Sequence, residues 1–226
     1  MFPLILAAAV ATAVPSPSVA PAGASPADGT YTYAMSLNGA QVETTAVTVK
    51  HDPSGKLVLS ESGTGTMNGR SGEVSDTLTL DQTLAPLGYS ANASIADSRS
   101  MQASLAFKGG RATQTGDVTK TYDLAADAKH FVVLDFGPFA GYFALPAQML
   151  AWNNQPVFAI VPMYAQGVPI AVDTSLTPER PKNVPATDVQ ISVKSPLQFT
   201  LGYDPKTLVV DEMDVPTEGV LVTRQA

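Results

Sequence analysis

From residue 30 onward, the chain consists of short segments in which apolar and polar residues alternate, separated by residues that favour turns. Such alternation is typical of antiparallel strands, because successive side chains of a strand point to opposite faces of the sheet. Asp76–Leu80, Met101–Phe107 and Val189–Lys194 show the pattern. At about six residues a strand, the chain has room for about a dozen strands. The alternation therefore predicts a mainly β protein and argues against a helical bundle.

Turn residues indicate how the first strands are joined. Thr30–Leu37 and Gln41–Lys50 flank Asn38-Gly39, a dipeptide suited to a type I′ turn because both of its central residues need positive φ. Asp52–Gly55 then reverses the chain into Lys56–Glu61. We therefore expect consecutive antiparallel strands joined by tight hairpins.

The segment Phe136–Trp152 departs from the alternation, since it is aromatic and carries no charge. We expect a helix of three to four turns that is buried on nearly all sides, with a kink or a split at Pro146. A following hairpin is predicted from Val157–Val161 and Val168–Val172, and a loop from Leu176–Pro185. The predicted fold is a single antiparallel, strongly curved sheet or open barrel of about a dozen strands wrapped around one buried helix.

The N-terminal segment Met1–Val14 is apolar, is shorter than the roughly 20 residues that span a bilayer, and is followed by small residues. This pattern is typical of a secretory leader. We predict a signal peptide over residues 1–22, a flexible tether over 23–29 and a single β domain over 30–226. The expected location is outside the cytoplasm, in the periplasm or the extracellular space, with no membrane span in the mature chain.

Composition excludes several kinds of chemistry. The chain has 13 Lys and Arg against 20 Asp and Glu residues, for a formal net charge of −7, and it has no Cys. An acidic chain offers no general attraction for phosphate backbones, so no nucleic-acid partner is expected. Without Cys there is no disulfide, no thiolate nucleophile and no Cys zinc site. We expect no cofactor.

The residues that catalysis most often uses lack the required patterns. Ser90 lies in Gly-Tyr-Ser-Ala-Asn, which has only the first glycine of a hydrolase nucleophile elbow. His51 and His130 have no second histidine at metal-ligand spacing, so we expect surface roles for both. No catalytic residue and no metal site are predicted.

The densest acidic cluster is Asp211-Glu212-Met213-Asp214. Strand alternation places Glu212 and Asp214 on one face, where paired carboxylates could bind Ca²⁺ or act as acid and base. We expect instead a solvated sheet face, because carboxylates are mostly exposed.

The uncharged aromatic segment is the remaining candidate for a site. It either fills the curved sheet completely as ordinary core, the commoner outcome, or leaves a gap for an apolar ligand. The candidate ligand contacts are Phe139, Tyr142, Phe143, Met149 and Trp152. The excess of acidic residues favours a ligand that is apolar or amphipathic, with a neutral or cationic head.

Three classes of function are compatible with these features. A module that binds or carries an apolar or amphipathic small molecule is the leading hypothesis, because it needs no reactive groups. A structural or protein-interaction module of the cell envelope, with an envelope protein as partner, is the alternative. An enzyme is the weakest hypothesis and would have to use scattered carboxylates such as Asp211, Glu212 and Asp214.

The chain also resembles a family of exported bacterial β proteins of unknown function. The resemblance rests on Tyr31–Gly39, Thr79–Tyr89, Val133–Phe136 with the aromatic helix that follows, Phe158–Pro162 and the closing hairpin from Tyr203 to Arg224. These packing and turn motifs span most of the chain after the leader. The resemblance implies a curved single-sheet β shell similar in shape to lipoprotein carriers, and it supplies no catalytic residues.

Overall fold

The computed structural model describes residues 25–67, 69–96, 100–124, 128–135, 137, 139–170, 172–173, 188–193 and 198–226. The predicted signal peptide, Phe136 and the loop predicted at Leu176–Pro185 lie outside the described residues. Within the described part, no helix is both long enough and apolar enough to cross a membrane.

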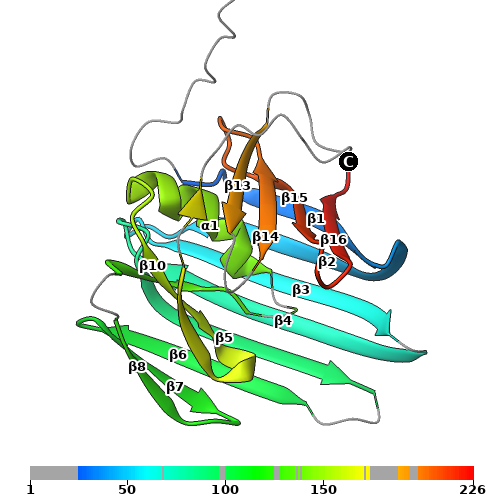
Figure 1. The fold of residues 1–226 in the computed structure, drawn as a ribbon, viewed down its shortest axis with the longest axis horizontal. Coiled ribbons are helices and arrows are strands. Elements are labelled where there is room, and N and C mark those ends of the chain that lie inside the picture. The colour runs from blue at the N-terminus through cyan, green and yellow to red at the C-terminus, as the bar shows by residue number, and fades with distance from the viewer. Residues whose placement is uncertain are drawn as a thin grey trace, which may run out of the picture.

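Thirteen strands form one large sheet in the order β12-β13-β14-β15-β16-β1-β2-β3-β4-β5-β6-β7-β8 (Figure 1). The strands are β1 (Gly29–Leu37), β2 (Ala40–His51), β3 (Leu57–Met67), β4 (Arg70–Leu80), β5 (Pro86–Ile95), β6 (Met101–Lys108), β7 (Arg111–Gly116), β8 (Lys120–Asp123), β12 (Val172–Asp173), β13 (Val189–Val193), β14 (Phe199–Tyr203), β15 (Val210–Val215) and β16 (Val220–Arg224). Neighbouring strands are antiparallel, and β1 joins the two halves by pairing with both β2 and β16. The sheet is curved and not closed, with β8 and β12 at its edges. The predicted mainly β fold, a large curved antiparallel sheet around a helix, is confirmed.

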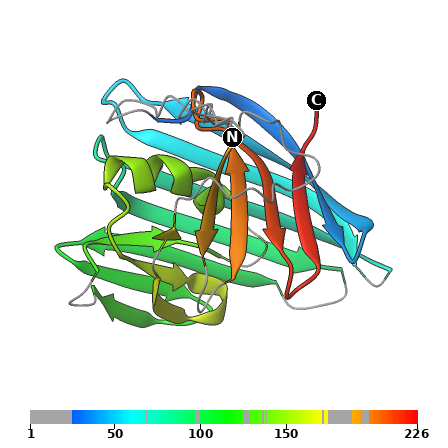
Figure 2. The same ribbon diagram turned by 45° about the horizontal axis from the view of Figure 1, so that its top comes forward.

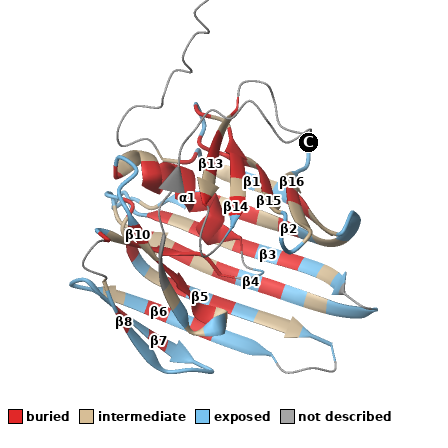
Figure 3. Ribbon diagram, viewed as in Figure 1, coloured by how far each residue is buried: buried red, intermediate tan, exposed pale blue. Residues whose placement is uncertain are grey.

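The predicted hairpins form at the expected turns. Asn38 and Gly39 have φ values of 51° and 82°, as a type I′ turn requires. After the turn at Asp52–Gly55, β3 begins at Leu57 and pairs with β2. Alternate residues of β2 and β4 are buried, as the banded colouring of Figure 3 shows. The sequence pattern therefore sets the register of the sheet.

A second, three-stranded sheet lies within the curve of the first, in the order β11-β10-β9. It contains β9 (His130–Val133), β10 (Val157–Val161) and β11 (Gln166–Ile170), with the short 3-10 helix η1 (Pro162–Tyr164) between β10 and β11. The predicted hairpin of β10 and β11 is confirmed, but β9 and β10 are parallel. This small sheet is an addition to the large antiparallel one, and the buried helix serves as the crossover that its parallel pair requires.

The described residues contain one α-helix, α1 (Ala140–Ala151), which joins β9 to β10. Figure 2 shows it against the inner side of the large sheet, and it contacts β3, β4 and β9. A Cβ atom at Gly141 would lie 1.9 Å from the carbonyl oxygen of Val133, so only glycine allows this close packing on β9. The helix runs through Pro146, so of the kink or split expected there, the split does not occur. It ends where Asn153 and Asn154 adopt positive φ.

Candidate functional site

The interior of the shell differs between its two ends. At the end where β4 turns into β5, the Trp152 indole Nε1 donates a hydrogen bond to the Thr83 carbonyl oxygen, and the Gln148 amide donates to that of Leu84. We call this the packed end, because the side chains of α1 fill it. The opposite end contains the last residues of β3 and β5 and the first residues of β4. We call it the open end, because a cavity lies there.

The cavity has a volume of about 560 Å³, within the range of about 300–1,000 Å³ typical of small-molecule sites. Most of its lining side chains are apolar: Met35, Leu37, Val42, Val74, Ala93, Ile95, Tyr142, Tyr164, Phe199, Met213, Val215 and Val220. The charged lining residues are Glu43, Arg70, Glu73, Asp135 and Glu218. Ile95 and Tyr164 are 38% and 57% exposed, so they mark the side on which the cavity meets solvent. An apolar pocket with a few polar groups is the usual form of a ligand site.

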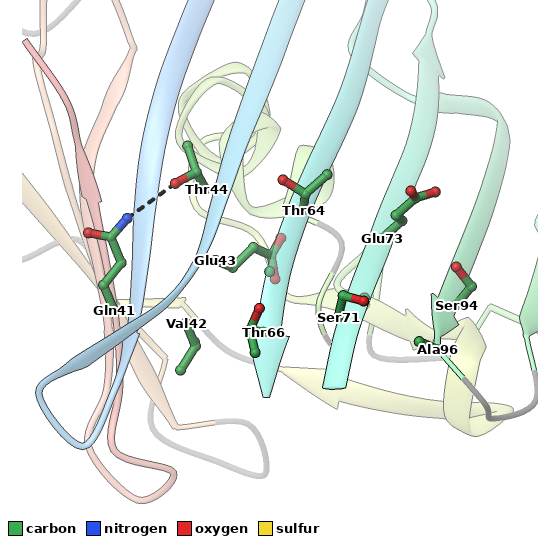
Figure 4. A pocket seen from close by; sticks show the side chains of 12 residues that line it. Gln41, Val42, Glu43, Thr44, Thr64, Thr66, Ser71, Glu73, Ser94 and Ala96 are labelled. Carbon is green, nitrogen blue, oxygen red and sulfur yellow. Dashed lines mark hydrogen bonds between the residues drawn. The ribbon is translucent and has the colours of Figure 1, made fainter. Parts of the chain in front are cut away.

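A second, more open groove of about 710 Å³ adjoins the cavity (Figure 4). Its walls are more polar and include Gln41, whose amide donates a hydrogen bond to the Thr44 hydroxyl at 3.1 Å. Glu43 and Glu73 line both hollows. Glu43 therefore stands at the junction between the polar groove and the apolar cavity.

Two glycines make room for the Glu43 side chain. Glu43 pairs with Gly65 across β2 and β3, and a Cβ atom at the neighbouring inward position, Gly63, would lie 2.5 Å from the Glu43 carboxyl oxygen Oε1. That oxygen is buried and has no hydrogen-bond partner among the described residues. Burial raises the pKa of Glu43 above its ordinary value. The carboxyl group thus occupies a glycine-lined notch, and one of its oxygens lacks a partner within the part of the chain that the structure describes.

Behind Glu43, two more carboxyl groups face each other across β3 and β4. Glu61 is 4% exposed and accepts hydrogen bonds from the Thr45 hydroxyl, at 2.7 Å, and from the Phe139 backbone N–H, at the N-terminus of α1. Asp76 is paired with Glu61 in the strand register, and neither of its oxygens has a hydrogen-bond partner in the described chain. Burial raises the pKa of Glu61 to about 7. Burial, together with the nearby Glu61 charge, also raises the pKa of Asp76 well above its ordinary value.

Asp135 completes a series of acidic side chains that leads back to the cavity wall. It is 1% exposed and accepts hydrogen bonds from the Tyr89 hydroxyl and the Met163 backbone N–H, each at 3.0 Å. Asp135 lies near enough to Asp76 to raise the pKa of that residue further. We call Glu43, Glu61, Asp76 and Asp135 the acidic row. Among the described residues, no group of three His, Asp or Glu side chains is arranged to hold a metal ion.

The two innermost members of the row carried a sequence signal. In β3, Glu61 is an even number of residues from the buried Leu57 and Leu59. In β4, Asp76 is an even number of residues from the buried Leu78 and Leu80. Strand alternation places such residues on the core face. A carboxylate at a core position is uncommon, because charged groups are seldom fully buried without partners. This combination of phase and charge identifies both residues without a structure.

Of the five ligand contacts predicted from the sequence, the structure places one at the cavity. Tyr142 lines it, and its ring meets that of Phe199 edge to face at 5.2 Å. The other four, Phe139, Phe143, Met149 and Trp152, are at most 6% exposed and belong to the core. Phe139 and Phe143 pack on the ring of Tyr33, and Trp152 stacks on His130. The remaining cavity residues come from strands that are distant in sequence, and no local sequence motif indicates that they lie together.

The acidic cluster near the C-terminus is not a solvated face. Glu212 and Met213 point to opposite sides of β15, and both are buried. Burial raises the pKa of Glu212 to about 7, and the Asp214 charge adds to this effect. Asp211 forms an ion pair with Arg224 at 2.7 Å. The expected exposure is wrong for Glu212 because β15 is covered on both faces at this position.

His51 takes part in a hydrogen-bonded chain on the surface. Its Nδ1 atom lies 2.5 Å from the Asp28 carboxylate, and its Nε2 atom lies 2.8 Å from the Ser25 hydroxyl. This order of groups matches that of serine hydrolases. However, the residue after Ser25 is Pro26, which has no N–H to contribute to an oxyanion hole, and none of these residues lines the cavity or the groove. The chain of contacts fastens the segment before β1 to the end of β2.

Comparison with known proteins finds similarity only at the level of the fold. No protein-family model and no curated protein matches the chain. A β-barrel-like protein of the domain-of-unknown-function family DUF1849 from Brucella abortus is similar in structure, with a TM-score of 0.50 and 10% identity over 92% of this chain and 97% of that chain. A DUF1089 family protein from Pseudomonas aeruginosa has a TM-score of 0.48 and 9% identity over 78% of this chain and 90% of that chain. The similarity to the Brucella abortus protein shows that the chain has a β-barrel-like fold found in a protein of unknown function, as the resemblance in its sequence implies.

Proposed function

We propose that the protein binds an amphipathic small molecule in the cavity at the open end. The observation that carries this proposal is the lining: apolar side chains from both halves of the sheet surround about 560 Å³, and the charged groups are few. Burial of a ligand's apolar part in such a space contributes about 25 cal/mol for each Å² removed from water. The cavity therefore supplies affinity through apolar contact and orientation through its carboxyl groups.

The exposed surface gives less support to the alternative, a protein-interaction module. The large apolar side chains exposed by more than a third in the described chain are Leu87, Ile95, Met101, Val118 and Tyr164. Two of them, Ile95 and Tyr164, border the cavity. Single exposed apolar residues are normal on soluble proteins, whereas a docking surface for a protein usually has a continuous patch. Ligand binding accounts for the exposed residues at the cavity mouth.

The binding proposal is tested with N-phenyl-1-naphthylamine, an uncharged apolar dye whose fluorescence rises when it leaves water. We expect saturable binding of one dye per chain. Ala93 lines the cavity, so Ala93→Phe should fill part of it and abolish or strongly weaken binding. Asn92→Phe is the matched control, because Asn92 is the neighbouring residue on the outer face of β5. The absence of saturable binding, or equal binding by both folded variants, contradicts the proposal.

We also propose that the chain is exported, on the basis of the apolar leader and the small residues that follow it. A carrier or receptor for amphipathic molecules is useful where such molecules pass between membranes. Mass spectrometry of the protein isolated from its own host should find an N-terminus near Gly23. Isolation of the intact chain, beginning at Met1, from the cytosol contradicts export.

A further inference from the structure

We propose that the ligand carries a cationic group, an amine or a quaternary ammonium, and that this group binds against Glu43 and Asp135 at the inner wall of the cavity. The inference rests on the proposed binding function and specifies the ligand's chemical class. It combines three features of the site: an incompletely partnered carboxyl group, a pair of aromatic rings and an excess of negative charge.

The Glu43 carboxyl group is the first feature. Its Oε1 atom is buried in the notch over Gly63 and has no hydrogen-bond partner in the described chain, although the side chain lines the cavity. A buried carboxylate oxygen without a partner is costly to the free protein. A positive charge in the cavity beside this carboxyl group would offset that cost by Coulomb attraction, without direct contact with Oε1. An anionic or purely apolar group would leave it in place.

The aromatic pair is the second feature. Tyr142 and Phe199 both line the cavity, with their ring centroids 5.2 Å apart and their planes at 81°. Aromatic ring faces carry partial negative charge and attract cations, an attraction of about 0.5–2 kcal/mol that grows when the cation is removed from water. Carboxylates beside aromatic rings are therefore a suitable environment for an ammonium group.

The balance of charge is the third feature. Glu43, Glu73, Asp135 and Glu218 line the cavity, whereas Arg70 is the cationic side chain among the lining residues. Glu61 and Asp76 lie behind this wall and interact electrostatically with Glu43 and Asp135, respectively. In a low-dielectric cavity of this kind, the electric field of the carboxylates favours binding of a cationic group and opposes binding of an anionic one. Recognition of phosphate or carboxylate would require a cluster of Arg or Lys side chains instead.

The experiment compares three amphiphiles that share a decyl chain and differ in charge: decyltrimethylammonium, decyldimethylamine oxide and decyl sulfate. Each is used below its micelle concentration to displace N-phenyl-1-naphthylamine at pH 8. We expect the cation to bind at least about tenfold more tightly than the anion, a difference of about 1.4 kcal/mol, because the carboxyl groups attract one charge and repel the other. The preference should decrease as salt is added, since screening weakens the charge component.

The variants identify the carboxyl group responsible. Glu43→Gln should weaken binding of decyltrimethylammonium about tenfold and leave binding of the uncharged dye unchanged. Glu73→Gln is the comparison variant, because Glu73 is an exposed carboxyl group of the same cavity; solvent screens its charge, so this change should weaken binding of decyltrimethylammonium less than Glu43→Gln does. Dye binding also shows that each variant is folded.

The two proposals fail in different ways. If the dye does not bind, the binding function and the cationic ligand are both wrong. If the dye binds but the three amphiphiles compete equally, or decyl sulfate competes best, only the cationic ligand is wrong. The same conclusion follows if Glu43→Gln and Glu73→Gln have equal effects on decyltrimethylammonium.

Discussion

The packed end and the open end are built from the same kinds of residue and differ in how completely the space is filled. At the packed end, Phe143 and Met149 have no exposed surface, and helix α1 occupies the inside of the sheet. At the open end, Phe199 of β14 and Met213 of β15 line one side of the cavity, and residues of β4 and β5 line another. The comparison teaches that a high local density of aromatic residues marks the core of this protein. The candidate site arises where segments distant in sequence converge without filling the space.

Removing a large side chain at each end should give the greatest contrast. Phe143→Ala empties a fully buried site at the packed end and should lower the free energy of unfolding by about 3–5 kcal/mol. Ile95→Ala, at the 38% exposed rim of the open end, should cost less than about 1 kcal/mol. Urea denaturation followed by circular dichroism measures both. Similar costs at the two positions would mean that the interior is not divided in this way.

The acidic row, which lies between the two ends, should make stability depend on pH. Burial raises the pKa of Glu61 from 4.5 to about 7, so folding favours its protonated form. The corresponding stabilisation is complete below pH 4.5 and is lost as the pH rises through about 7. For this residue alone the difference is about 3 kcal/mol, and the raised pKa of Asp76 acts in the same direction.

Urea denaturation at pH 5 and pH 8 tests this dependence. The wild type should be more stable at pH 5, and Glu61→Gln should reduce the difference mainly by stabilising the protein at pH 8. Glu73→Gln, at an exposed position, is the control and should leave the difference unchanged. Greater stability of the wild type at pH 8 would show that the row is ionised in the folded protein at little cost.

A smaller effect is expected from the glycine notch under Glu43. In Gly63→Ala the new methyl group would meet Glu43, Thr45 and Val74 within 2.5–2.9 Å, so we expect a loss of about 1–3 kcal/mol. Gly88→Ala is the matched control, since the nearest atom to its Cβ would be 3.7 Å away. That change should be neutral or slightly stabilising in denaturation experiments. If Gly63→Ala proves as mild as Gly88→Ala, the notch does not constrain Glu43.

Much of the fold follows from local sequence patterns. Alternation places Leu57 and Leu59 on the core face, and Asn38-Gly39 forms the predicted turn, because both features depend on a few neighbouring residues. The parallel pairing of β9 and β10 depends on how α1 folds back over the sheet. That arrangement is a property of the assembled chain, and alternation within either strand does not specify it.

The candidate site is predictable only in part. The phase of Glu61 and Asp76 within their strands indicates buried carboxyl groups. The cavity, in contrast, brings Glu43 near β14 and β15, about 150 residues later in the chain. The volume of the cavity depends on how the large side chains of these distant strands pack against one another. No local sequence pattern specifies that packing. The ligand contacts were predicted in the aromatic segment because it is dense in large side chains, and most of those side chains belong to the core.

Nuclear magnetic resonance of methionine methyl groups tests the division of the interior most directly. Met35 and Met213 line the cavity, whereas Met149 is fully buried at the packed end. With ¹³C-methyl methionine in the protein, addition of decyltrimethylammonium should shift the Met35 and Met213 signals and leave the Met149 signal in place. A shift of Met149 alone, or no shift at saturating ligand, would contradict the assignment of the open end as the binding site.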